Sequence, residues 1–92
     1  MEKIEDIIKR GAANIIDVRT PGEFSGGHVA GSINIPLNTL PAKMDEIKDL
    51  ENIVLCCASG ARSRSAYDFL SSNGIDCYDL GSWMNVNYIA NN

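Results

Sequence analysis

The sequence predicts one α/β domain, over residues 1–92, in which a mainly parallel sheet of four to five strands carries helices on both faces. Three observations support this prediction. Short apolar runs typical of buried strands alternate with segments whose apolar residues recur at helical spacing. A length of 92 residues suits a single domain. A loop of small residues, 57–61, joins an apolar run to a helical pattern, which is the usual place for a ligand site in an open α/β sheet.

The first half of the chain contains two candidate strands among short helices and turns. Ile4, Ile7 and Ile8 stand at positions i, i+3 and i+4, which indicates one face of a helix. Pro21 suits either a turn or the first position of a helix. We therefore expect a helix ending at Gly11, a strand over 14–18, a turn or short helix over 20–27, a strand over 32–35, and two short helical pieces over 37–50 on either side of Pro41.

The second half repeats the order of strand and helix. Ala66, Phe69 and Leu70 have helical spacing, and the pair Asn73-Gly74 is a typical helix end. We expect a strand over 53–56, a helix over 61–73, a strand over 75–80 and a short helix over 83–89.

The composition and net charge indicate which kinds of binding partner to expect. The chain is 45% hydrophobic and 22% charged, and 8 basic against 12 acidic residues give a net charge of −4. No basic stripe appears, so we do not expect a nucleic-acid partner. Any anionic substrate has to be attracted by a local field, because the molecule as a whole repels it. We expect a monomer or a weak dimer.

The cysteines and the apolar runs indicate the cellular compartment in which we expect the protein. Cys56, Cys57 and Cys77 have no spacing typical of a disulfide framework, which favours a reducing compartment, and we expect a cytoplasmic protein. The charged N-terminus lacks the apolar region of a signal peptide, and no apolar run approaches ~18 residues, so we expect no membrane segment. Cysteine pairs with zinc-site spacing are absent, so we expect no metal and no cofactor.

The loop after the third strand carries the chemistry. Gly60 permits a positive φ angle, and the small residues Ala58, Ser59 and Ala61 leave backbone N–H groups uncovered. A helix that begins at such a loop favours negative charge, so Cys57 is expected to ionise readily and Arg62 to add positive charge. The sequence therefore predicts a thiolate nucleophile, Cys57, in an anion-binding cradle formed by residues 58–62.

Two motifs resemble those of the single-domain rhodanese (sulfurtransferase) family over nearly the whole chain. The first motif consists of Asp17-Val18-Arg19, Glu23-Phe24, Gly27-His28-Val29, Gly31-Ser32 and Asn34-Ile35-Pro36. The second motif is Cys57-x-x-Gly60-x-Arg62-Ser63, which resembles the six-residue active-site loop of that family. The resemblance implies a rhodanese-like fold and sulfur transfer through a persulfide on Cys57, without a cofactor.

The resemblance also implies that the first motif supports the structure. We expect Arg19 and Glu23, four residues apart, to form an ion pair beneath the loop, and Asp17 to brace the same turn. His28 is the single histidine; we considered it as a general base, but in the family it belongs to the structural motif, so its ring is expected to bond the loop backbone. Thiosulfate or a persulfide is the expected donor, and cyanide or a thiol, free or on a protein, the expected acceptor.

Two other functions remain open at this stage. Cys56 and Arg62 fit the C-x5-R signature of phosphatases and arsenate reductases, in which case Cys56 would face the cradle. A non-catalytic binding module with this fold is the other alternative. Strand alternation points Cys56 away from Cys57, which favours a core position for Cys56, and Cys77 is also expected in the core.

The chain departs from the family in three respects. No strand precedes the first helix, so the fifth strand is expected to be small or absent. Ser82 replaces a glycine in what we expect to be a turn beside the site. The loop positions 58, 59 and 61 are neutral, whereas some relatives that use thiosulfate have basic residues there, so a persulfide is the more favoured donor.

Overall fold

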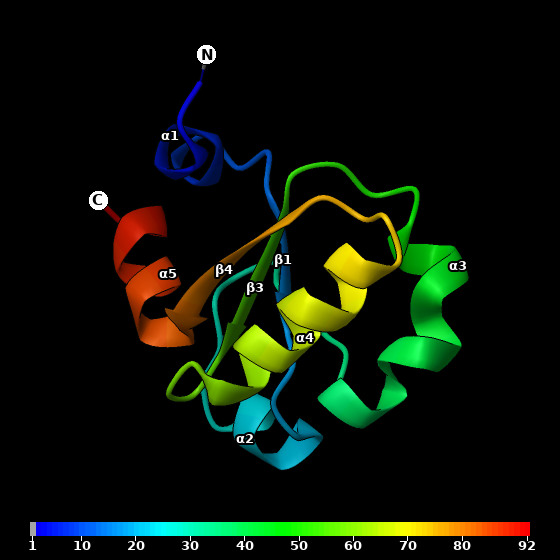
Figure 1. Ribbon diagram of the computed structural model, residues 1–92. Coiled ribbons are helices and arrows are strands. Elements are labelled where there is room, and N and C mark those ends of the chain that lie inside the picture. Colours follow the sequence, from blue (N-terminus) through cyan, green and yellow to red (C-terminus); the bar gives the residue numbers. More distant parts are fainter. Residues whose placement is uncertain (1) are drawn as a thin grey trace.

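The computed structural model describes residues 2–92, and within them four parallel strands form one sheet in the order β2-β1-β3-β4 (Figure 1). The central strands β1 and β3 pair along four residues, with Asp17 opposite Cys56. The strands are β1 (Asn14–Asp17), β2 (Ile33–Asn34), β3 (Ile53–Cys57) and β4 (Cys77–Ser82). The predicted mainly parallel α/β architecture is confirmed.

Helices cover both faces of this sheet, as expected. One face is covered by α1 (Ile4–Lys9) and α5 (Trp83–Ala90). The other face is covered by the 3₁₀ helix η1 (Leu37–Lys43), α3 (Met44–Ile47) and α4 (Ala61–Ser72) (Figure 1). The short α2 (Pro21–Ser25) lies near the carboxyl end of the sheet, beside the start of α4. None of the helices in residues 2–92 has the length and apolar character needed to cross a membrane.

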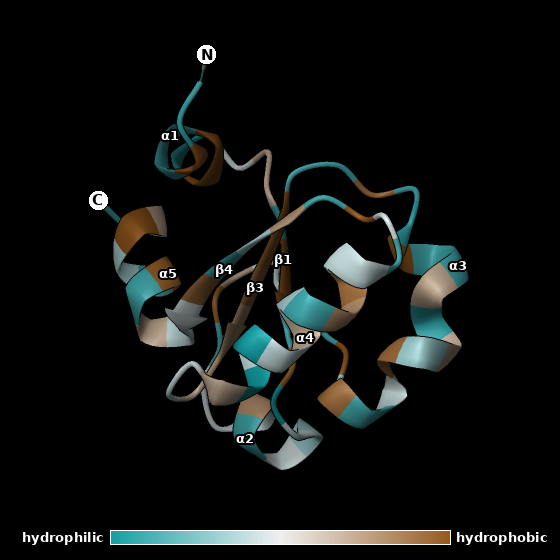
Figure 2. Ribbon diagram, viewed as in Figure 1, coloured by the Kyte–Doolittle hydropathy of each residue, from teal (hydrophilic) through white to brown (hydrophobic). Residues whose placement is uncertain are grey.

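The central strand β3 is buried on both faces, and its side chains alternate between two hydrophobic clusters. Ile53, Leu55 and Cys57 belong to the cluster beneath α4, whereas Val54 and Cys56 belong to the cluster beneath α1 and α5. In Figure 2 the ribbon of β3 is mostly brown, whereas the helices around it carry both brown and teal bands. The direction in which each cysteine points is therefore fixed by its place in the strand.

The last strand starts and ends two residues later than expected. Gly74, at a φ angle of +78°, and Ile75 close the end of α4, because their N–H groups bond the carbonyl oxygens of Ser71 and Leu70. Ile75 is therefore committed to the helix end and not to the strand.

The other end of β4 contains a bulge where we expected a turn. Leu55 lies opposite Asp79, but Cys57 lies opposite Ser82, so β4 has one extra residue there. Gly81 adopts a φ angle of +74°, and its N–H donates to the Asp79 carboxylate at 3.0 Å. The bulge brings Ser82 and the start of α5 beside Cys57.

Candidate active site

The loop between β3 and α4 turns sharply at Gly60. This residue has a φ angle of +108°, which an L side chain rarely adopts, and it is the N-cap of α4. The Gly60 carbonyl oxygen accepts the first backbone hydrogen bond of the helix, from the Arg64 N–H at 3.1 Å, and a bond from the Ser63 hydroxyl at 3.1 Å. The loop is therefore held by its own helix, with the N–H groups of that first turn near Cys57.

The sulfur of Cys57 lies directly under this loop. The Gly60 N–H donates to Cys57 Sγ, with 3.0 Å between nitrogen and sulfur. Burial raises the pKa of Cys57, but hydrogen bonds from the Ser63 hydroxyl and from the backbone N–H groups of Ser63, Gly60 and Arg62 outweigh it, so the pKa lies below the ordinary value of a thiol. These donors stabilise a thiolate at this position.

Cys56 has the opposite surroundings. It packs in the cluster beneath α1 and α5, and burial, followed by the nearby Asp17 charge, raises its pKa to about 12. The C-x5-R alternative required Cys56 to face the loop, and this placement rules it out. Cys77 is half-buried and packs against the α4 side of the core, and burial raises its pKa.

The predicted ion pair between Arg19 and Glu23 is wrong. Arg19 pairs with Asp17, two residues earlier on the same face of the chain, through Nε to Oδ1 at 2.9 Å and Nη2 to Oδ2 at 2.8 Å. Both side chains are buried, so the guanidinium takes the buried carboxylate. Arg19 also donates to the carbonyl oxygens of Gly27 at 2.6 Å and Glu23 at 3.4 Å, and its guanidinium carbon lies 4.8 Å from the centroid of the Trp83 ring.

Glu23 pairs instead with Arg62, the last residue of the loop. Arg62 Nη1 lies 2.7 Å from Glu23 Oε1, and Nη2 lies 3.0 Å from Oε2. Glu23 can reach Arg62 because it is the third residue of α2, where its carboxylate also bonds Thr20 in a capping box. These hydrogen bonds, of which the one from Arg62 contributes most, lower the pKa of Glu23 to about 2. The ion pair connects the loop to α2.

The remaining candidates lie around the loop without touching the sulfur. The His28 ring stacks on Phe24, with 3.7 Å between centroids, and its Nδ1 lies 2.7 Å from the Phe24 carbonyl oxygen. The ring therefore bonds backbone, but the carbonyl oxygen belongs to α2 and not to a loop as expected. Ala58, Ser59 and Ala61 are exposed, and their small side chains form the outer surface of the loop.

A profile of the rhodanese-like domain family matches residues 1–87. The chain belongs to the rhodanese-like domain family. Over 69 residues it is 44% identical to the uncharacterized protein YqhL of Bacillus subtilis, and over 60 residues it is 35% identical to a sulfurtransferase of Allochromatium vinosum. These matches cover 74% and 65% of this chain but only 55% and 56% of the two relatives, so the chain spans about half of their length.

Solved structures agree with this assignment. The crystal structure of a rhodanese-related protein of Thermoplasma volcanium has a TM-score of 0.76 and 32% identity, and the match covers 92% of this chain and 86% of that one. The Cys57 loop lies at the carboxyl end of the central strand, which is the usual place for a ligand site in an open α/β sheet.

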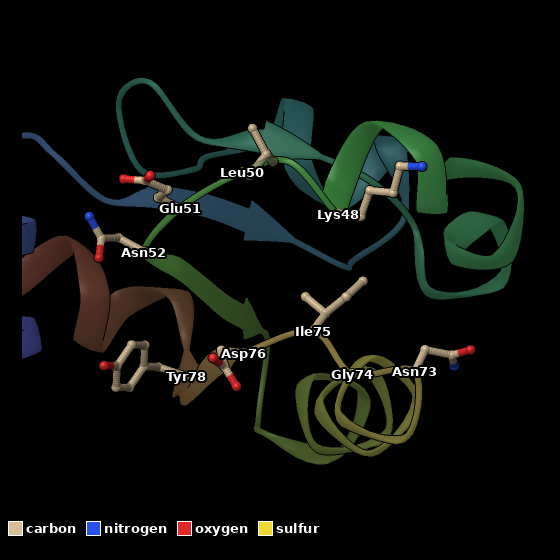
Figure 3. A pocket seen from close by; sticks show the side chains of 9 residues that line it. All are labelled: Lys48, Leu50, Glu51, Asn52, Asn73, Gly74, Ile75, Asp76 and Tyr78. Atoms are coloured by element: carbon tan, nitrogen blue, oxygen red, sulfur yellow. The ribbon is translucent and has the colours of Figure 1, made fainter.

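This rhodanese-like domain also has a hollow far from Cys57. The hollow has a volume of about 580 Å³ and lies where the chain enters β3 and β4, at the opposite end of the sheet from the loop (Figure 3). Asn52 and Ile75 line it with hydrophilic neighbours such as Lys48, Glu51 and Asp76. None of the residues that line it is a cysteine, whereas the loop at the other end of the sheet surrounds Cys57. Across residues 2–92, no group of three or more His, Cys, Asp or Glu side chains is arranged to hold a metal ion.

Sequence reasoning missed two features of the site. The first is the Ser63 hydroxyl, which donates to the Gly60 carbonyl oxygen at 3.1 Å and lowers the pKa of Cys57. A polar residue on the otherwise apolar buried side of α4 was the available signal. The second is that Cys57 has no exposed surface in this conformation, for which its place directly after the apolar run 53–56 was the available signal.

Proposed function

We propose that this rhodanese-like domain is a sulfurtransferase that carries a sulfane sulfur on Cys57. The observation that supports this most directly is the hydrogen bond from the Gly60 N–H to Cys57 Sγ, within a loop whose other donors lower the thiol pKa. The sulfurtransferase among its relatives points to the same class of reaction. The donor is thiosulfate or a persulfide, and the acceptor is cyanide or a thiol.

The first half-reaction is a displacement at sulfur. The Cys57 thiolate attacks the outer sulfur of the donor, a Cys57 Sγ–S bond forms, and the S–S bond of the donor breaks. The electron pair of that bond leaves with sulfite when the donor is thiosulfate, or with a thiolate when the donor is a persulfide. Charge balances, because the terminal sulfur of the new persulfide keeps the single negative charge of the attacking thiolate.

The second half-reaction reverses the direction of attack. A nucleophile such as cyanide attacks the outer sulfur of the Cys57 persulfide, the Sγ–S bond breaks, and Cys57 leaves as a thiolate. The N–H groups of Gly60, Arg62 and Ser63 stabilise the negative charge at each stage. Neither half-reaction requires a redox partner.

Access to the sulfur requires a movement of the loop. Cys57 has no exposed surface, whereas Ala58 and Ser59 directly above it are exposed. The loop is short and has only small outer side chains, so a small shift of residues 58–60 suffices to uncover Sγ. The thiol also has to stay reduced, which fits a reducing compartment such as the cytoplasm.

The test compares the wild type with Cys57→Ser and Cys56→Ser. Each protein is incubated with thiosulfate, its mass is measured, and cyanide is then added to release thiocyanate. We expect one added sulfur atom and thiocyanate from the wild type and from Cys56→Ser, and neither from Cys57→Ser.

Two results would contradict the proposal. A wild type that accepts no sulfur from thiosulfate or from a small persulfide would favour a binding module. Loss of transfer in Cys56→Ser, with Cys57→Ser still active and folded by circular dichroism, would move the nucleophile to the other cysteine.

A further inference from the structure

The positive charge of Arg62, at the end of the active-site loop, is already neutralised. Both terminal nitrogens of Arg62 bond the carboxylate of Glu23, at 2.7 and 3.0 Å, in a two-point arrangement. The two side chains are 35% and 38% exposed, so the pair lies at the surface of the loop. A donor that approaches Cys57 therefore meets a neutral pair and not a free cation.

The carboxylate of Glu23 is also held in place from its own side. Its Oε1 accepts the Thr20 N–H at 3.0 Å and the Thr20 hydroxyl at 3.1 Å, as well as the bond from Arg62. A capping box fixes this orientation whether or not Arg62 is present. Glu23 is therefore a preorganised negative charge that faces the active-site loop.

Arg62 is coupled to the sulfur through its charge. It is the last residue of the loop, its backbone N–H bonds Cys57, and the charges of the Arg62 and Cys57 side chains attract each other. A change in the net charge of the Glu23–Arg62 pair is therefore felt at the place where a donor binds.

We propose that Glu23 is a specificity-determining residue that selects donors of low charge, monoanions such as persulfides and thiosulfonates, over the dianion thiosulfate. The proposal rests on the sulfurtransferase function proposed above. The net charge of −4 and the neutral loop positions 58, 59 and 61 act in the same direction, because they add no attraction for a dianion.

The size of the effect follows from the charges. The Coulomb energy between the site and a donor scales with the product of their charges. Removal of one negative charge from the site therefore lowers the interaction free energy of a dianion by twice as much as that of a monoanion. If a monoanion gains roughly threefold in kcat/KM, the dianion gains roughly tenfold, and the ratio between the two donors rises roughly threefold.

The experiment uses Glu23→Gln and two donors of different charge. Gln keeps the length of the side chain, and its carbonyl oxygen still caps Thr20, so the fold is retained. Thiosulfate is the dianion, and methanethiosulfonate is a monoanion that delivers the same outer sulfur and leaves as a sulfinate. The matched control is Asp68→Asn, which changes the net charge equally but frees Arg64, whose pair with Asp68 is exposed and 3.3 Å long.

We expect kcat/KM for thiosulfate to rise roughly tenfold and that for methanethiosulfonate roughly threefold in Glu23→Gln, with the larger gain shrinking in high salt. In Asp68→Asn the ratio between the donors should stay that of the wild type. Arg62→Met should move the ratio in the opposite direction, which tests the same pair from its other side.

Two different failures can be distinguished. A wild type and Glu23→Gln that both transfer sulfur with the same ratio between the donors would overturn the role of Glu23 and leave the sulfurtransferase function standing. An equal change of the ratio in Asp68→Asn would also overturn it, since the effect would then be one of net charge. A wild type that takes sulfur from neither donor would overturn both proposals.

Discussion

Two cysteines that are neighbours in the chain have opposite surroundings. Cys57 lies under a loop that directs hydrogen-bond donors at its sulfur, whereas Cys56 lies in an apolar cluster on the other face of the sheet. The alternation of side chains along β3 is enough to separate them. The comparison shows that the position of a residue at a strand end, rather than its residue type, decides whether a thiol has the surroundings of a nucleophile.

Each cysteine also has its own arginine–carboxylate pair. The pair near Cys56, Arg19 with Asp17, is buried and connects β1 to the region around Gly27 and Trp83. The pair near Cys57, Arg62 with Glu23, is partly exposed and links the loop to α2. The buried pair should therefore matter for stability, and the exposed pair for the selectivity of the site.

The reactivity of the two thiols gives the sharpest test of this contrast. Burial raises the pKa of Cys56 to about 12, whereas hydrogen bonds lower the pKa of Cys57, so at neutral pH the thiolate fraction is far larger for Cys57. We expect iodoacetamide to label Cys57 first, and Cys56 only on unfolding. Peptide mapping by mass spectrometry measures this. Equal labelling of both thiols in the folded protein would break the comparison.

The two arginines should differ in their effect on stability. Arg19→Ala leaves the buried Asp17 carboxylate without its partner and should cost about 3–5 kcal/mol, whereas Arg62→Ala breaks a surface pair and should cost less than about 1 kcal/mol. Urea unfolding followed by circular dichroism measures both. A cost for Arg62→Ala equal to that for Arg19→Ala would show that the exposed pair is structural too.

The Ser63 hydroxyl should account for part of the low pKa of Cys57. Ser63→Ala removes one donor to the thiolate, so the pKa of Cys57 should rise and the rate of labelling at neutral pH should fall about tenfold. Ser65→Ala is the matched control, because its hydroxyl bonds the Ala61 carbonyl oxygen on the exposed side of the same helix. An unchanged pH profile of labelling in Ser63→Ala would assign the pKa to the backbone donors alone.

Most of the fold could be predicted because its signals are local. The apolar run 53–56, the spacing of Ala66, Phe69 and Leu70, and the breaks at glycine and proline each depend on a few adjacent residues. The start of β4 and the bulge in it could not be placed, since both depend on which N–H group bonds which carbonyl oxygen or carboxylate.

The site was predicted less completely for a related reason. The loop Cys57 to Arg62 is continuous in sequence, so the nucleophile and its cradle were proposed from the sequence, whereas the partner of each arginine depends on tertiary structure. The i, i+4 spacing of Arg19 and Glu23 suggested a pair, but burial placed Arg19 against Asp17, and the capping box turned Glu23 toward Arg62. Spacing alone does not determine which carboxylate a charged side chain meets.

The smallest effect is expected from Glu23 at acidic pH. Its bonds, that from Arg62 first, lower the folded-state pKa from 4.5 to about 2, so this contribution to stability is fully present above pH 4.5 and is lost as the pH falls toward 2. Because the group is exposed, the loss should be slight. We expect the free energy of unfolding, measured in urea between pH 5 and pH 2.5, to fall less steeply in Glu23→Gln than in the wild type. Asp68→Asn should keep the slope of the wild type, and a Glu23→Gln slope equal to that of the wild type would mean that the pair with Arg62 does not persist in solution.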